Sequence, residues 1–194
     1  MDVDLYLASQ SPRRRQLLEQ IGVRFAVKIA NINETILADE NPEQHVKRLA
    51  FEKANAIWNS LSESTRLPVL AADTVVCLDG EILGKPIDQA SAALMLRSLS
   101  GREHQIFTGI ALISERHSVC VNVSNVRFRE LTQTEIEEYW ATGEPEDKAG
   151  GYAIQGRAAT FVSHLSGSYS GVVGLPLYET AQLLSEYNIP IWQN

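Results

Sequence analysis

The stretch PVLAADTVVCL, residues 68–78, is an almost unbroken apolar run that contains a single carboxylate, Asp73. Apolar runs of this length, bounded by turn signals, are typical of a strand buried on both faces. The run ends at Asp79-Gly80, a strong signal for a tight turn, and resumes as EILGKP over residues 81–86. We therefore expect a buried strand at the centre of the fold, followed directly by a turn.

On the N-terminal side of this run, strand and helix patterns alternate. Ser11 and Pro12 suit the N-cap and the first position of a helix that Gly22 closes. A polar loop over residues 31–41 precedes a longer amphipathic helix. The elements expected here are strands at residues 4–9 and 24–30 and helices at about 12–21 and 42–61.

On the C-terminal side, two long β patterns are expected to pair, and Thr132 with Glu135 forms a capping box at the start of a helix. Residues 144–174 are rich in glycine and predict no regular element. The elements expected are strands at residues 104–113 and 118–131 and helices at about 88–99, 132–142 and 176–184. This order predicts an α/β fold in one domain, residues 1–194, with helices covering a mixed, twisted β-sheet.

The charge balance and the cysteines disfavour several classes of protein. There are 17 lysines and arginines against 24 aspartates and glutamates, a net charge of −7, so a nucleic-acid polymer is not the expected partner. The net charge does not exclude a small anionic ligand that binds in a locally basic pocket. Cys77 and Cys120 lack metal-ligand spacing and are expected to be buried free thiols. No apolar stretch suits a membrane span and no signal peptide is evident, so we expect a cytoplasmic protein.

The segment SQSPRR, residues 9–14, places cations at the expected start of a helix, where the helix dipole disfavours them. Free backbone N–H groups, the hydroxyls of Ser9 and Ser11 and the guanidinium groups would together suit a phosphate. The alternative is a solvated helix start, which is the interpretation we favour for Arg15 alone.

Four further charged residues point to chemistry. Asp73 interrupts the buried run, although a carboxylate at a strand end can also cap a loop. Lys53 falls in the apolar stripe of its helix, where it either reaches solvent or points into a cleft. Lys85 and Glu34 are weaker signals on their own. Together these residues supply cations for a polyphosphate and carboxylates for a divalent metal, the equipment for metal-assisted attack of water on a phosphoanhydride.

Several familiar catalytic motifs do not occur. The sequence contains no GxxxxGK[ST], GxSxG or HExxH, which argues against a P-loop NTPase, an α/β-hydrolase and a zinc protease. His104 and His164 lie close to the ends of expected strands, so we predict that both are hydrogen-bonded structural residues.

Seven motifs together resemble the Maf family of nucleoside triphosphate pyrophosphatases. They occur in the family's order and span nearly the whole chain. The motifs are SQSPRR (9–14), EKA (52–54), AADTVV (71–76), LGKP (83–86), SGREHQIFTG (100–109), DKAGGYAIQG (147–156) and SYSGVVGLPL (168–177).

The resemblance implies hydrolysis of a nucleoside triphosphate to the monophosphate and pyrophosphate with a divalent cation, Mg²⁺ or Mn²⁺. It also implies two lobes around a central cleft, as in the inosine triphosphate pyrophosphatases, and a homodimer. Asp73 matches the catalytic aspartate that accepts a proton from the attacking water, and Glu34 with Asp73 would serve the metal. The residues implied in phosphate binding are Ser9, Ser11, Arg14, Lys53 and Lys85.

Three positions resemble the dTTP/UTP branch of the family rather than the 7-methyl-GTP branch: Arg13, Thr74 and Gln155. The amide of Gln155 both donates and accepts hydrogen bonds, so it suits the O4/N3 edge of thymine or uracil. Phe51 and Ser166 depart from the residues common in the family, and neither is expected to alter the chemistry.

Two alternatives to dTTP/UTP hydrolysis stay open from the sequence. One is a house-cleaning pyrophosphatase for inosine or modified nucleotides. The other is a regulator of cell division that binds a triphosphate without turnover, since the family is also associated with septum formation. The set of Glu34, Lys53, Asp73 and Lys85 favours catalysis, because binding alone does not need a placed base.

Overall fold

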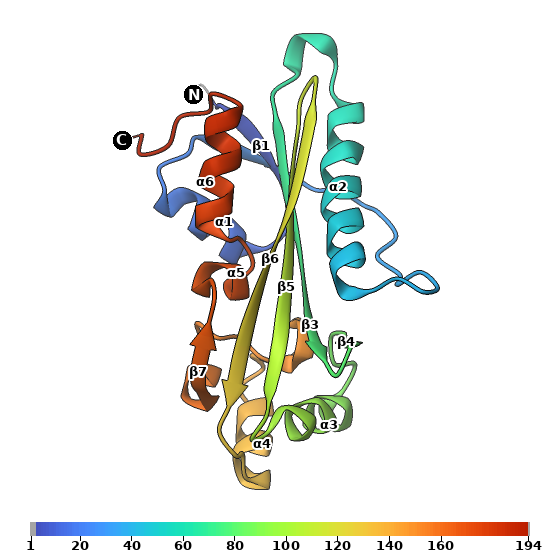
Figure 1. Ribbon diagram of the computed structural model, residues 1–194, viewed down its shortest axis with the longest axis vertical. Helices are drawn as coiled ribbons and strands as arrows, with labels where there is room; N and C mark the ends of the chain where they lie inside the picture. The colour runs from blue at the N-terminus through green and yellow to red at the C-terminus, as the bar shows by residue number, and fades with distance from the viewer. Residues whose placement is uncertain (1–2, 194) are drawn as a thin grey trace.

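The computed structural model, which describes residues 3–193, shows a seven-stranded mixed β-sheet (Figure 1). The strand order is β2-β1-β3-β5-β6-β7, with β4 paired to β3; β2, β1 and β3 are parallel and the other pairs antiparallel. This confirms the predicted mixed sheet. The strands are β1 (Leu5–Ala8), β2 (Phe25–Lys28), β3 (Val69–Leu78), β4 (Glu81–Leu83), β5 (Glu103–Ile113), β6 (His117–Phe128) and β7 (Val162–Ser166).

Helices flank both faces of the sheet, as predicted. Figure 1 shows α2 along one side of the long central strands, α1, α5 and α6 on the other side, and α3 with α4 at one end. The helices are α1 (Pro12–Gln20), α2 (Pro42–Ser60), α3 (Gln89–Leu99), α4 (Gln133–Trp140), α5 (Tyr169–Val173) and α6 (Leu177–Glu186), with 3₁₀ turns η1 (Glu63–Thr65), η2 (Ala149–Gly151) and η3 (Arg157–Phe161). No helix in residues 3–193 combines the length and apolar character needed to cross a membrane.

Most predicted boundaries agree with the structure to within a few residues, and the predicted caps form. The Ser11 side chain accepts a hydrogen bond from the Arg14 N–H, and Thr132 with Glu135 makes the predicted capping box of α4. The strand predicted at 24–30 is shorter, because its partner β1 offers only four residues for pairing. Cys77 is buried as predicted, but the prediction for Cys120 was wrong, since it is only partly buried on the less covered strand β6.

The glycine-rich segment 144–174 contains more structure than its sequence indicates. It forms η2, η3, β7 and α5, all of them short. Gly150, Gly151, Gly167 and Gly174 adopt positive φ, which divides the segment into pieces too brief for a periodic pattern to emerge.

The sheet is interrupted along one edge of β3, and this interruption positions the site. β1 pairs with β3 only at Val69 and Leu70, whereas β4 pairs only with residues 76–78. Residues 71–75 are therefore paired with β5 on one side and with no described strand on the other. The gap between the end of β1 and the start of β4 opens the centre of the sheet to a cleft.

α2 approaches the sheet unusually closely at Gly109 of β5. A Cβ atom on this glycine would lie 2.6 Å from the carbonyl carbon of Val46 and 3.1 Å from the Lys47 nitrogen, and closer still to the Val46 oxygen. The helix therefore rests on backbone rather than on side chains at this point. Gly109 pairs with Asp73, so the contact lies directly beside the residue that interrupts the central strand.

His104 is a buried structural residue, as predicted. It is 2% exposed, its Nε2 lies 2.7 Å from the Tyr152 hydroxyl, and its ring meets the edge of Phe128. The other ring nitrogen, Nδ1, has no hydrogen-bond partner. Burial lowers the pKa of His104 from 6.5 to about 4, so the ring stays neutral in the folded protein at pH 7.

This burial predicts an acid-labile contribution to stability. The unfolded chain binds a proton at this position below pH 6.5 but the folded chain does so only below about pH 4, so stability falls as the pH falls between these values. By linkage, the loss amounts to about 2 to 3 kcal/mol at pH 4. Urea unfolding measured from pH 7 to pH 4 should show this component in the unmodified protein and not in His104→Gln. If the exposed-site control His164→Gln removed the same component, the assignment to His104 would be wrong.

Candidate active site

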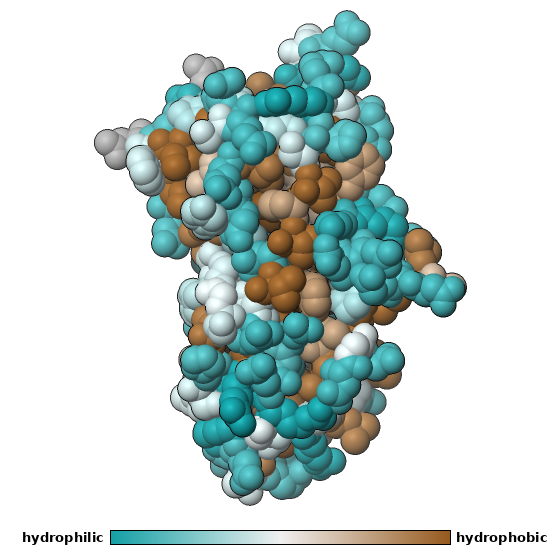
Figure 2. Space-filling model, in the orientation of Figure 1, coloured by the Kyte–Doolittle hydropathy of each residue, from teal (hydrophilic) through white to brown (hydrophobic). Residues whose placement is uncertain are grey.

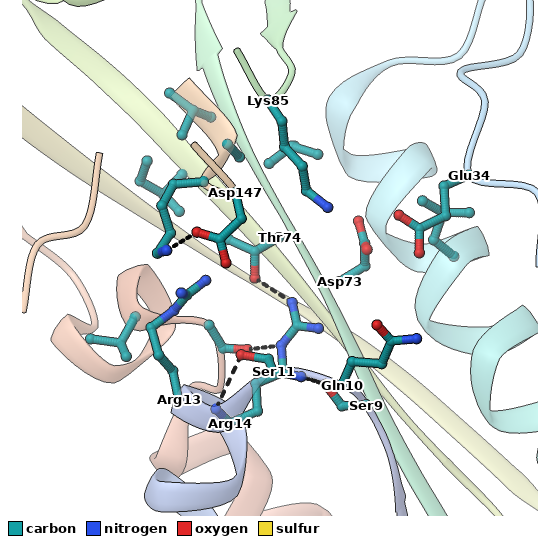
Figure 3. Close-up of a pocket in the computed structure, with 18 of the residues that line it drawn as sticks. Ser9, Gln10, Ser11, Arg13, Arg14, Glu34, Asp73, Thr74, Lys85 and Asp147 are labelled. Carbon is teal, nitrogen blue, oxygen red and sulfur yellow. Dashed lines mark hydrogen bonds and ion pairs between the residues drawn. The ribbon is translucent and has the colours of Figure 1, made fainter. Parts of the chain in front are cut away.

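A cavity of about 640 Å³ lies at the interruption of the sheet (Figure 3). The residues around it come mainly from the end of β1 and the N-terminus of α1, the loop before α2, α2 itself, β3, β4 and the turn after it, the segment 147–155, and the C-terminal end of α5. Its charges differ from those of the chain as a whole, because five cationic and only three carboxylate side chains line it. The cations are Arg13, Arg14, Lys53, Lys85 and Lys148, and the carboxylates are Glu34, Asp73 and Asp147.

Lys53 joins the two carboxylates at the centre of the site. Its Nζ lies 2.7 Å from Asp73 Oδ1 and 2.7 Å from Glu34 Oε1. Lys53 and Asp73 are both buried, which excludes the alternative that this lysine reaches solvent, while Glu34 is half-exposed. Burial alone would raise the pKa of Glu34, but the neighbouring ammonium of Lys53, with Lys85 and Arg14, lowers it below its usual value.

Asp73 and Thr74 are neighbours on β3, so their side chains leave opposite faces of the strand. Asp73 faces α2 and its lysine. The Thr74 hydroxyl accepts hydrogen bonds from Arg14 Nη2 at 3.1 Å and from Thr108 Oγ1 at 3.0 Å, on the side of α1 and α5. Both side chains reach the same cavity because the edge of β3 is unpaired here. Figure 3 shows the Arg14 guanidinium between Thr74 and Asp73.

The segment 9–14 behaves as a helix start with distinct roles for its members. The Ser11 N–H donates to Ser9 Oγ at 3.1 Å, which turns the chain from β1 into α1. Arg14 is held by a bond from its Nε to the Gly174 carbonyl at 2.8 Å, and burial lowers its pKa. Arg13 projects separately towards Asp147 (Figure 3). Arg15 is exposed, as predicted, and its one ion pair within the described residues 3–193 is with Glu19.

Lys85 and Gln155 reach the cavity from its outer rim, and both are exposed. Figure 3 shows Lys85 pointing down towards Asp73. The loop that carries Gln155 is fixed by Glu144, which accepts hydrogen bonds from the Tyr139 hydroxyl at 2.7 Å and from the Arg157 N–H at 3.1 Å. Every candidate residue named from the sequence thus lines one cavity.

Sequence reasoning did not name two of the charged residues at this site. Asp147 and Lys148 contact each other and line the cavity opposite Asp73. Both lie in the DKAGGYAIQG motif, and an adjacent acid and base separated from two glycines by a single alanine is the signal that could have identified them. His45 also lines the cavity from α2, and the sequence pattern did not single it out.

The carboxylate pair fits a divalent cation that is shared with a substrate. Glu34 Oε1 and Asp73 Oδ1 both contact the Lys53 ammonium, so the two carboxylates lie close together, and the described contacts of Lys53 leave the second oxygen of each carboxylate for a metal. Among residues 3–193 there is no cluster of three or more histidine, cysteine or acidic side chains suited to a metal. Mg²⁺ is commonly held by one or two carboxylates together with substrate phosphates, which matches this donor set better than a site made of protein ligands alone.

Comparison with known proteins places the chain among close relatives. The family described as Maf-like protein matches residues 4–187. The chain is 57% identical to the dTTP/UTP pyrophosphatase of Alkalilimnicola ehrlichii, over 95% of this chain and 93% of the relative. It is 49% identical to the dTTP/UTP pyrophosphatase of Saccharophagus degradans, over 98% and 92%. A solved structure, the Ham1 protein of Staphylococcus aureus, covers 64% of this chain and 71% of its own, with a TM-score of 0.43 and 16% identity.

Proposed function

The chain belongs to the Maf family, and from this we propose that it hydrolyses dTTP and UTP to the monophosphate and pyrophosphate. The structural observation that supports the proposal is the pair of carboxylates, Glu34 and Asp73, held by Lys53 beside an excess of cations. A nucleoside triphosphate brings the complementary charge, with a phosphate chain for the cations and a metal-binding oxygen for the carboxylates.

In this proposal the phosphate chain lies across the start of α1. Ser9, Ser11 and Arg14 approach it from this side, and Lys85 approaches it from the other. Lys53 contributes a third cation from α2. Because these groups are already in place, binding orients the phosphate chain and neutralises its charge at little cost in reorganisation.

Asp73 accepts the proton of the water that attacks the α-phosphorus, and pyrophosphate leaves. The buried carboxylate suits this role because Lys53 fixes it at 2.7 Å while the cavity lies open on its other side. Mg²⁺ or Mn²⁺, held by Glu34, Asp73 and the substrate, would polarise the phosphate and offset its developing charge.

Selection of the base is assigned to Arg13, Thr74 and Gln155, the positions that resemble the dTTP/UTP branch. Gln155 supplies an amide on a fixed loop, which both donates to and accepts from a pyrimidine edge. Thr74 acts by holding Arg14 rather than by reaching the base, since its hydroxyl already receives the Arg14 guanidinium.

A panel of canonical and modified triphosphates with Mg²⁺ or Mn²⁺ tests this function. We expect turnover of dTTP and UTP to the monophosphate and pyrophosphate, and a loss of at least about 10²-fold when the metal is removed by EDTA, because the five cationic side chains do not neutralise three carboxylates and a triphosphate on their own. Chromatography of the nucleotide products, together with an assay of the released phosphate, would measure the products and the loss of turnover without metal. Orthophosphate and a diphosphate as products would contradict the assignment of the broken bond.

The same panel separates the alternatives. Faster turnover of inosine triphosphate or of modified nucleotides would favour a house-cleaning enzyme. Binding of triphosphate, measured by calorimetry, without any turnover would favour a regulator.

On the strength of the family, we place the protein in the cytoplasm. For the same reason we expect it to form a homodimer. Figure 2 shows apolar residues gathered in a band along the middle of one face, where β6 runs in Figure 1, with hydrophilic residues on both sides. Light scattering on the purified chain would establish its oligomeric state.

A further inference from the structure

The loop between β2 and α2 carries Glu34 but has no helix or strand of its own over residues 29–41. Glu34 is half-exposed, and its only described partner is Lys53. An acidic side chain on such a loop would sample many positions unless the backbone around it were fixed. Contacts that fix the backbone of this loop are therefore needed to keep Glu34 in one place.

Arg48, on α2, makes the contacts that hold it. Its Nε lies 2.6 Å from Glu40 Oε1 and its Nη2 lies 2.7 Å from Glu40 Oε2, which is a two-pronged ion pair. The same Nη2 donates to the Thr35 carbonyl at 3.1 Å. Arg48 thus binds the loop at its C-terminal end and at the residue next to Glu34.

Glu40 is the loop's half of the anchor and is almost completely buried, with 7% of its side chain exposed. Besides Arg48 it contacts His45 Nδ1 at 2.8 Å and accepts from the Leu37 N–H at 3.1 Å. A carboxylate with this many partners holds one orientation, so the loop is tied to α2 through it.

The direction of the loop follows from these contacts. Glu34 and Ile36 line the cavity, whereas Thr35 between them turns its carbonyl towards Arg48, which does not line the cavity. Arg48 and Lys53 lie on the same helix and hold the same loop, one from outside the site and one from inside.

We propose that Arg48 and Glu40 are positioning residues that fix the 29–41 loop so that Glu34 stands beside Asp73 and completes the divalent-cation site. This rests on the proposed function only in taking Glu34 as a metal ligand. Neither residue lines the cavity, so their effect passes through Glu34.

A double-mutant cycle tests the proposal. Mn²⁺ binding is measured by electron paramagnetic resonance, with Mn²⁺ alone and with the α,β-imido analogue of UTP, for the unmodified chain, Arg48→Met, Glu34→Gln and the double variant. Arg48→Met should weaken Mn²⁺ binding by about tenfold, as is usual when support of a metal ligand is removed. In the Glu34→Gln background the same change should alter binding by less than about twofold, because coupled residues are not additive.

Two further variants sharpen the result. Arg48→Lys keeps the positive charge but cannot form the two-pronged ion pair with Glu40, so it should recover only part of the Mn²⁺ affinity that Arg48→Met loses. Lys47→Met, which removes an exposed lysine paired with Glu43 on the same helix, is the matched control and should leave Mn²⁺ binding unchanged. Hydrogen exchange of residues 29–41 should rise in Arg48→Met and not in Lys47→Met.

Three outcomes would overturn the proposal. These are unchanged Mn²⁺ binding in Arg48→Met, an effect of equal size with and without Glu34, and unchanged Mn²⁺ binding in Glu34→Gln. The measurement does not require turnover, so a failure of the unmodified chain to hydrolyse dTTP or UTP would contradict the proposed function separately.

Discussion

Asp73→Asn should reduce the turnover of dTTP and UTP by at least about 10²-fold, the usual contribution of a placed general base. An amide of the same shape keeps a hydrogen-bond acceptor for Lys53 but cannot take a proton from water. The loss corresponds to about 2.7 kcal/mol or more in activation free energy. Steady-state kinetics at saturating metal would measure it, and the Michaelis constant should change far less than the turnover number.

The fold of Asp73→Asn should persist, because Lys53 keeps its ion pair with Glu34 at 2.7 Å. A matched control is Asp79→Asn, in the turn after β3, where the carboxylate is exposed and pairs with Arg102. That variant should retain full activity. If Asp73→Asn kept turnover within about threefold of the unmodified protein, Asp73 would not be the general base.

Gly109→Ala should lower the free energy of unfolding by about 3 kcal/mol, because the added methyl group would overlap backbone atoms, which cannot move aside as a flexible side chain can. The new methyl group would meet the Val46 carbonyl, so α2 would have to lift from the sheet. For a chain of this size the change corresponds to a fall of roughly 6 to 12 °C in Tm. Calorimetry and urea unfolding would both record it.

The variant should also lose activity, since α2 carries Lys53 to Asp73. Gly84→Ala is the matched control for stability, because no atom lies within 4 Å of the position of its Cβ and its φ is ordinary. An unchanged Tm in Gly109→Ala would show that α2 accommodates the methyl group by a small shift.

Asp73 and Lys53 could be predicted from sequence because each breaks a regular pattern. Asp73 interrupts an apolar strand and Lys53 occupies an apolar helical stripe, so both stand out in the sequence alone. A regular apolar pattern indicates which positions face the core, and the structure confirms that both side chains are buried.

The position of Glu34 and the division of labour between Arg13 and Arg14 could not be predicted in this way. Glu34 lies on a loop without periodicity, and contacts from α2 decide where it points. Arg14 is fixed by the carbonyl of Gly174, which is 160 residues away in sequence. Local patterns carry no information about such distant contacts, and for the same reason β7 and α5 were not predicted.

The opposite orientations of Asp73 and Thr74 make the length of β3 as important as its composition. Side chains alternate along a strand, so a deletion or insertion of one residue between Leu70, which pairs with β1, and Asp73 would exchange the two faces from that point on. The carboxylate would then face Arg14, the hydroxyl would face Lys53, and every apolar neighbour would change sides with them. We therefore expect related chains to differ in length at their loops and not within this segment.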